Sequence, residues 1–133
     1  MPERGTRWEK SPARLIERFG MILERFPDLE QRRMFGFPAA FTASGRLVSG
    51  LHGTAWIVRL SEADQTVLRE LGGHVFHPGG GRPMTGFLTV PNDIVADDHE
   101  VAKWIGLART FVATLPPKKP RKTSKRTKTS KGN

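Results

Sequence analysis

The sequence predicts an α+β fold in which helices flank an antiparallel sheet of about five strands. Two observations support this class. Apolar residues recur with helical spacing near both ends of the chain, and short β-type runs separated by glycines lie between them. The expected element order is α-β-β-β-α-β-β-α, and the sequence shows no internal repeat.

The first helix is expected over about residues 12 to 26. Ser11 offers an N-cap, and Pro12 would occupy the first helical position, where its missing N–H costs nothing. Pro27 ends the helix. The apolar stripe that would face the core consists of Leu15, Phe19, Ile22, Leu23 and Phe26.

Three strands are expected next, over residues 34–42, 46–51 and 54–60. Their short connections, with a hairpin turn at residues 44–45, favour an antiparallel meander. The stretch RRMFG at 32–36 would start the first strand, with Gly36 marking a bulge or a close approach of backbones. In the third strand, Ala55, Ile57 and Arg59 would face one side, and Trp56, Val58 and Leu60 the other.

A second helix is expected after Ser61, which resembles a capping box with Asp64, and Gly72 and Gly73 would end it. Two further strands are expected within residues 74–78 and 84–91, joined by the glycine loop 79–81. The final helix would begin at a cap formed by Asp97 or Asp98 and end before Pro116 and Pro117. It has the best helical periodicity in the chain.

The composition excludes several classes of site and of protein. A chain of 133 residues fits one domain, and the absence of cysteine excludes disulfides, thiolate metal sites and cysteine nucleophiles. The first ten residues lack the apolar core of a signal peptide, and no apolar run approaches the roughly 18 residues of a membrane span. We therefore expect a soluble, cytoplasmic protein.

The net charge of +9 is concentrated near the C-terminus. Residues 116–133 hold 8 of the 22 basic residues and none of the 13 acidic ones, which leaves 22 − 8 = 14 basic against 13 acidic residues elsewhere. We expect a flexible lead-in at 1–10, an α+β domain at 11–117 and a disordered basic tail at 118–133. The basic residues of the tail are Lys118, Lys119, Arg121, Lys122, Lys125, Arg126, Lys128 and Lys131.

The tail is the segment whose composition most directly suggests binding. Its charge would attract DNA or RNA through counterion release, and its lack of aromatic residues predicts little sequence preference. A tail that only increases solubility is an equally open alternative. An anionic membrane surface is a weaker candidate because no apolar anchor is present.

Three arginines of the domain are candidate contacts for a partner or an anion. Arg32 and Arg33 would point to opposite faces of their strand, and the alternative for them is an apolar stem packed on neighbours with the charged head in water. Arg82 follows three glycines whose N–H groups would suit a phosphate. The loop lacks the lysine, hydroxyl and following helix of a P-loop, so a simple hairpin connection is favoured.

The sequence indicates no catalytic residue, no metal site and no cofactor. His74 and His77 lie three residues apart, which on a strand places them on opposite faces. Ser49 and Ser61 lack the sequence setting of a nucleophile elbow. We expect a protein that is not an enzyme.

Three stretches together resemble the TfoX N-terminal domain family, also called TfoX/Sxy. They are RRMFG at 32–36, AWIVRLSEAD at 55–64 and FHPGGGRPMTGFLTVP at 76–91, and the resemblance spans roughly residues 13 to 117. It implies an α+β fold similar to that of secretion chaperones. It also implies a bacterial, regulatory or interaction module without catalytic residues. The namesake of the family regulates competence for DNA uptake and carries a helical C-terminal domain, in whose place this chain has its lysine-rich tail.

Three functional hypotheses follow from these observations. The first is an interaction module, binding a protein partner or itself, whose tail adds sequence-independent affinity for nucleic acid. The second is a module that binds a small phosphorylated ligand through the Gly79–Arg82 loop. The third is a purely structural domain that forms a homodimer.

Overall fold

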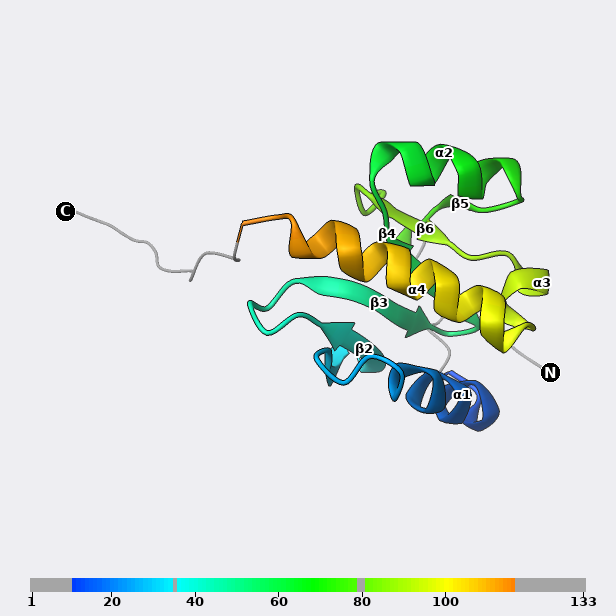
Figure 1. The fold of residues 1–133 in the computed structure, drawn as a ribbon. Helices are drawn as coiled ribbons and strands as arrows, with labels where there is room; N and C mark the ends of the chain where they lie inside the picture. The colour runs from blue at the N-terminus through cyan, green and yellow to red at the C-terminus, as the bar shows by residue number, and fades with distance from the viewer. Residues whose placement is uncertain (1–10, 35, 79–80, 117–133) are drawn as a thin grey trace.

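The computed structural model describes residues 11–34, 36–78 and 81–116. No helix in these ranges is both long and apolar enough to cross a membrane. The elements, shown in Figure 1, are α1 (Ala13–Leu23), β1 (Glu30–Met34), β2 (Phe37–Phe41), β3 (Leu47–His52), β4 (Ala55–Arg59), α2 (Glu62–Glu70), β5 (His74–Val75), β6 (Phe87–Thr89), α3 (Asn92–Val95) and α4 (Asp98–Ala113).

The six strands form one sheet in the order β1-β2-β3-β4-β6-β5, and all neighbouring strands are antiparallel. The predicted α+β class with flanking helices is confirmed, with one strand more than the five expected. β6 returns to pair with β4, so β5 forms the edge of the sheet opposite β1. In Figure 1, α4 lies across the sheet with α1 on one side of it and α2 on the other.

The main core lies between one face of the sheet and the helices. Trp56 of β4 is fully buried there, and the ring of Phe19 from α1 packs against it with the ring centroids 5.3 Å apart. α2 contributes Leu68 and α4 contributes Trp104 and Ile105 to the same cluster. The apolar stripes predicted for the first and last helices therefore face one common core.

A second apolar cluster lies on the opposite face, because successive side chains of a strand alternate between the two faces. We call it the outer cluster. Its described residues come from strands and the loops beside them, and no described helix contributes to it. It consists of Met34, Ala39, Phe41, Leu47, Ile57, Phe76, Met84 and Phe87.

The stretch RRMFG ends one strand instead of starting one. The run expected to be a single strand at 34–42 is a hairpin, in which β1 pairs with β2 and Met34 lies opposite Phe37. Gly36 adopts a φ of +82°, a left-handed conformation that favours glycine, so the chain reverses there. The expectation that Gly36 marks a bulge or a close approach of backbones is therefore wrong, because the pairing is regular up to the turn and an added Cβ at Gly36 would meet nothing within 4 Å. Arg32 and Arg33 lie within β1.

A bulge does occur, but in β3. Ala40 pairs with Ser49 and Phe41 pairs with Leu47, so Val48 is the extra residue. A single extra residue reverses the alternation of side chains along the strand. As a result, Val48 enters the main core and Leu47 joins the outer cluster.

The predicted helix ends are confirmed at α2 and α4 and are displaced at α1. The Ser61 hydroxyl accepts a hydrogen bond from the Asp64 N–H (3.2 Å), and the Asp97 carboxylate caps α4 by accepting from the N–H groups of His99 and Glu100. At α1 the N-cap is Pro12 and not Ser11, and no side chain caps the helix. The first helix also ends at Leu23, three residues before the expected end.

The remaining strands are shorter than expected, and one helix was missed. The expected strand at 74–78 is reduced to two residues in β5, and the strand expected within 84–91 to three in β6. Phe76 and Phe87 still connect the two segments through a backbone hydrogen bond of 3.0 Å, and Met84 donates to the Phe76 carbonyl (2.9 Å). The short α3 was not predicted. The hairpin turn at 44–45 is confirmed, with Gly45 at a φ of +91°.

The Ser49 hydroxyl forms two buried hydrogen bonds in the main core, and these give a first prediction. The Ser49 hydroxyl donates to the Ile57 carbonyl (2.7 Å) and accepts from the Trp56 indole N–H (3.1 Å). Ser49→Ala leaves the indole N–H without an acceptor, and should lower the free energy of unfolding by about 1–3 kcal/mol in urea titrations. The control is Ser44→Ala in an exposed turn, which should change the free energy of unfolding by less than about 0.5 kcal/mol. Equal stabilities of the two variants would contradict this role for Ser49.

Candidate functional site

Charge is unevenly distributed between the strand and helix segments of residues 11–116. The strand segments, residues 30–60 and 74–90, carry five arginines and one acidic residue, so their net charge is 5 − 1 = +4. The helix segments, residues 11–29, 61–73 and 91–116, carry six basic and ten acidic residues, so theirs is 6 − 10 = −4. The five strand-segment arginines are Arg32, Arg33, Arg46, Arg59 and Arg82.

The two arginines of β1 both have contacts within the domain. Arg32 pairs with Glu30 at 2.5 Å, and its guanidinium carbon lies 5.4 Å from the centroid of the Phe41 ring. Arg33 donates to the Gly36 carbonyl (2.8 Å) and so bridges the ends of the β1–β2 turn. Both side chains are exposed, and these contacts leave part of each guanidinium open to a partner.

The glycine loop lies only partly within the described residues. Gly79 and Gly80 fall outside them, and Arg82 is exposed, with no ion pair to a described residue. The Gly81 carbonyl oxygen lies 3.1 Å from His77 Nδ1, which ties that end of the loop to the domain. Arg32 and Arg33 lie on β1 and Arg82 lies in the connection between β5 and β6, and no hydrogen bond links Arg82 to either of them among the described residues.

The structure brings together two other arginines, Arg46 and Arg59. Both line a cavity of about 210 Å³ at the end of the outer cluster. Arg46 Nε donates to the Pro116 carbonyl (2.5 Å), and the Arg59 guanidinium carbon lies 5.7 Å from the centroid of the Phe87 ring. The pKa of Arg59 is lowered by burial and, to a smaller extent, by the positive charge of Arg46.

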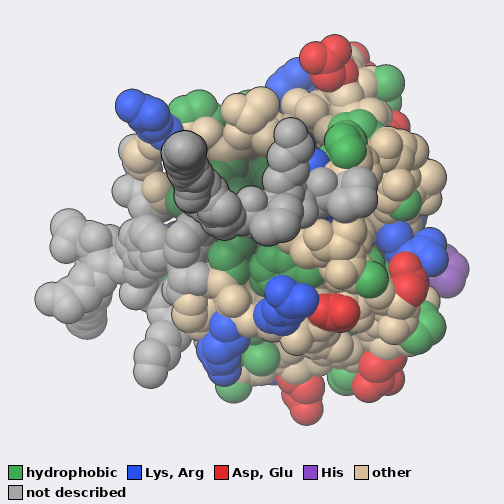
Figure 2. All heavy atoms as spheres, turned by 90° about the vertical axis from the view of Figure 1, so that its left-hand side faces the viewer, with side chains coloured by type: hydrophobic (Ala, Val, Ile, Leu, Met, Phe, Trp, Pro, Cys, Tyr) green, Lys and Arg blue, Asp and Glu red, His purple; other side chains and the backbone are tan. Residues whose placement is uncertain are grey.

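Sequence reasoning did not identify this pair as a site. The alternation of side chains in β4 predicts that Arg59 lies on the same side as Ile57. The structure confirms this, because Arg59 pairs with Phe87 and lies at the outer cluster. Arg46 stands in a turn, and nothing in its local sequence indicates that it approaches Arg59 or Pro116. Figure 2 shows hydrophobic side chains near the middle of one face of the molecule, with Lys or Arg side chains beside them.

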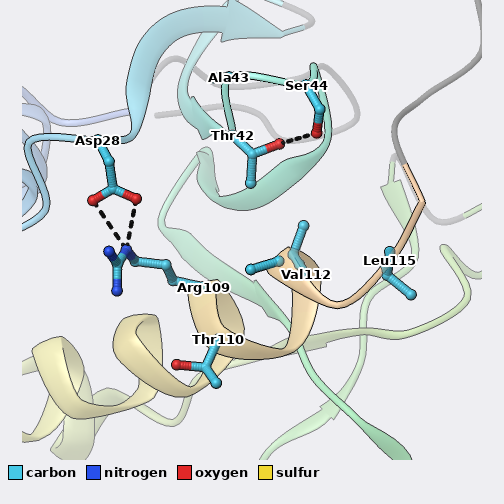
Figure 3. Close-up of a pocket in the computed structure, with 9 residues that line it drawn as sticks. Asp28, Thr42, Ala43, Ser44, Arg109, Thr110, Val112 and Leu115 are labelled. Atoms are coloured by element: carbon cyan, nitrogen blue, oxygen red, sulfur yellow. Dashed lines mark hydrogen bonds and ion pairs between the residues drawn. The ribbon is translucent and has the colours of Figure 1, made fainter.

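A second, larger hollow of about 420 Å³ lies between the C-terminal half of α4 and the β2–β3 turn. Figure 3 shows Asp28 and Arg109 pointing toward each other at one side of it, with Thr42 and Ser44 at another. Arg109 Nε donates to both Asp28 carboxylate oxygens, at 3.0 and 2.8 Å. The charges of Asp28 and Arg109 therefore neutralise each other, whereas Arg46 and Arg59 carry charges of the same sign.

The described residues do not form a recognisable catalytic or metal-binding arrangement. They contain no group of three or more His, Asp or Glu side chains placed to hold a metal ion. The Ser49 hydroxyl is buried and accepts a hydrogen bond from the Trp56 indole N–H, and the Ser61 hydroxyl caps α2. The eight basic residues of the tail and the expected lead-in at 1–10 lie outside the described residues.

Comparison with models of known protein families gives a match. The family model described as TfoX N-terminal domain matches residues 21–112, which is more than half of the chain. Comparisons with curated proteins and with solved structures give no significant match.

The Asp28–Arg109 pair leads to a second prediction. The hydrogen bond from Arg109 lowers the pKa of Asp28, so Arg109→Gln should raise that pKa toward its ordinary value of 3.8. An NMR titration of the Asp28 carboxyl group measures the change. Because the folded-state pKa is the lower one, the stabilisation from this pair is present above the unfolded-state pKa. It is lost as pH falls through the folded-state pKa.

Asp98 is the internal control for this titration. Its pKa is lowered by a separate hydrogen bond from Arg18, and should stay low in Arg109→Gln. An Asp28 pKa that does not respond to Arg109→Gln would show that the pair does not persist in solution.

Proposed function

Given that the chain belongs to the TfoX N-terminal domain family, we propose that it is a non-enzymatic interaction module that binds nucleic acid without sequence preference. The strand-segment arginines and the C-terminal basic segment act together on the phosphate backbone. Family membership indicates a regulatory or interaction module. The charge distribution supports nucleic acid as its partner.

The hydrogen bond between Arg46 and Pro116 carries this proposal. Pro116 is the last described residue, and its carbonyl oxygen lies 2.5 Å from Nε of Arg46, an arginine of the strand segments. Residues 117–133 follow directly and contain eight Lys or Arg and no acidic residue. The segment with a charge of +8 therefore follows a residue that is bound to Arg46, one of the five strand-segment arginines, and a phosphate backbone can contact both.

The helix segments make the approach of a polyanion directional. Their net charge of −4 repels phosphates, whereas the strand segments attract them. Binding of this kind is dominated by released counterions, so affinity falls steeply with salt. The basic segment has no aromatic side chain on which bases could stack, which disfavours sequence discrimination.

The same charges argue against a homodimer built by pairing the β1 edges of two copies. β1 forms one edge of the sheet and carries Glu30, Arg32 and Arg33. Charged side chains on an edge strand disfavour pairing with a second copy of that strand. The free edge is thus better suited to contacting a charged partner than to extending the sheet.

The test is the salt dependence of binding to random-sequence double-stranded DNA, followed by fluorescence anisotropy. The informative variant keeps the full chain and replaces the eight Lys and Arg residues of 118–131 with Gln. A truncation after Pro116 would instead place a new carboxylate next to Arg46. The slope of log affinity against log salt should become shallower by about 0.9 for each phosphate that the variant no longer neutralises, and binding should weaken at least tenfold at low salt.

A matched pair of double variants tests the contribution of the domain. Arg32→Gln with Arg82→Gln should reduce the salt slope by about 1–2. Arg14→Gln with Arg69→Gln removes the same charge from exposed positions on α1 and α2, and should leave the slope unchanged. Unchanged affinity and slope in the tail variant would refute the proposal, and equal effects of the two double variants would refute its directional part.

A further inference from the structure

The cavity at the end of the outer cluster combines apolar walls with two cationic side chains. Its volume is about 210 Å³. A cavity of about 150 Å³ lined by apolar side chains is already large enough to bind benzene. The space therefore accommodates one substituted six-membered ring. The lining residues are Met34, Phe41, Gly45, Arg46, Leu47, Arg59, Met84 and Phe87.

The walls come from segments that the sheet topology brings together. Met34 and Phe41 lie on β1 and β2, Leu47 lies on β3, Phe87 begins β6, and Met84 lies just before β6. Two methionines in one small cavity provide flexible, polarisable contacts, which adapt to different apolar ligands.

Arg59 lines this cavity and carries one donor without an acceptor. Its Nε is buried, and no described residue accepts a hydrogen bond from it. The stem of Arg59 passes close to Gly86, where an added Cβ would lie 3.5 Å from Nε. The terminal nitrogens of the same guanidinium carry four further N–H donors, and an acceptor that a ligand brings can accept from these.

Arg46 adds a second positive charge near the first. Its Nε is occupied by the Pro116 carbonyl, which leaves the terminal nitrogens of the guanidinium for other acceptors. No carboxylate lines the cavity, and the described residues offer neither Arg46 nor Arg59 an ion-pair partner. An anion placed between the two guanidiniums would receive charge-assisted hydrogen bonds and relieve their mutual repulsion.

We propose that this cavity binds a small anion that carries one ring-sized apolar group, with a carboxylate or a phosphate as its charged end. The apolar group occupies the space between Met34, Met84 and Phe87, and the anionic group contacts Arg46 and Arg59. Arg46 and Arg59 also belong to the strand-segment arginines, but the tail residues take no part in this site, so it does not depend on nucleic-acid binding.

The two halves of the site predict which ligands bind. Inorganic phosphate lacks the group that would displace water from the apolar walls, and benzyl alcohol lacks the charge that the arginines require. Each should therefore bind at least tenfold more weakly than phenyl phosphate. Benzoate should bind as well, because a carboxylate accepts the same hydrogen bonds from a guanidinium.

The methionines provide a direct measurement in the full-length protein. With ¹³C-labelled methionine methyl groups, phenyl phosphate and benzoate should shift the signals of Met34 and Met84 in a saturable manner. Met21, which is 60% exposed on α1, should not respond. Arg59→Gln and Arg46→Gln should each weaken binding about tenfold or more, and Arg14→Gln should leave it unchanged.

Two further variants test whether the ligand occupies this cavity and not the basic tail. Met84→Trp, which fills the cavity without changing charge, should abolish the shift of Met34 even if an arginine variant fails to fold. The variant with a neutral tail should bind phenyl phosphate as tightly as the natural sequence. The proposal is overturned by an absence of saturable shifts, by equal binding of benzyl alcohol and phenyl phosphate, or by loss of binding when the tail is neutralised.

Discussion

The position of Trp56 in β4 is the constraint on which the rest of the structure depends. This side chain is fully buried between the sheet and the helices, where it contacts Phe19 and donates to Ser49. Because side chains alternate along a strand, burying Trp56 on this face places Ile57 and Arg59 on or beside the opposite one. An arginine is thereby held against the apolar outer cluster, on the face to which no described helix contributes. The core of the protein and the cationic character of its other face have the same structural origin.

The connections of the sheet then determine what surrounds Arg59. The bulge at Val48 turns Leu47 toward the outer cluster, and the pairing of β6 with β4 places Phe87 opposite Arg59. Arg46, at the end of the β2–β3 turn, approaches from a third direction and holds the end of the segment after α4 through Pro116. Positive charge therefore gathers at one end of the sheet because of backbone topology, although residues 11–116 are neutral as a whole.

The sequence was sufficient to predict the elements whose signals are local. The periodicity of the last helix, the cap at Ser61 and the turn at Gly45 depend on neighbours within a few residues, and all three are confirmed. The hairpin at Gly36 was missed because a glycine between apolar residues is compatible with a bulge as well as with a turn. The proximity of Arg46 to Arg59 and to Pro116 depends on contacts between residues 13 and 70 positions apart, for which the local sequence carries no signal. The candidate site was therefore only partly predictable: Arg59 could be assigned a face, but its neighbours could not be identified.

The most direct measurement of this arrangement is a ¹⁵N-edited nuclear Overhauser experiment on the side-chain N–H of Arg59. With Arg59 on the outer face, this proton should show contacts to the ring protons of Phe87 and to the α-protons of Gly86, and none to α4. Contacts from Arg59 to Trp104 or Ile105 would mean that β4 faces the other way. The division of the sheet into a helix-covered face and a face that carries Arg59 would then be wrong.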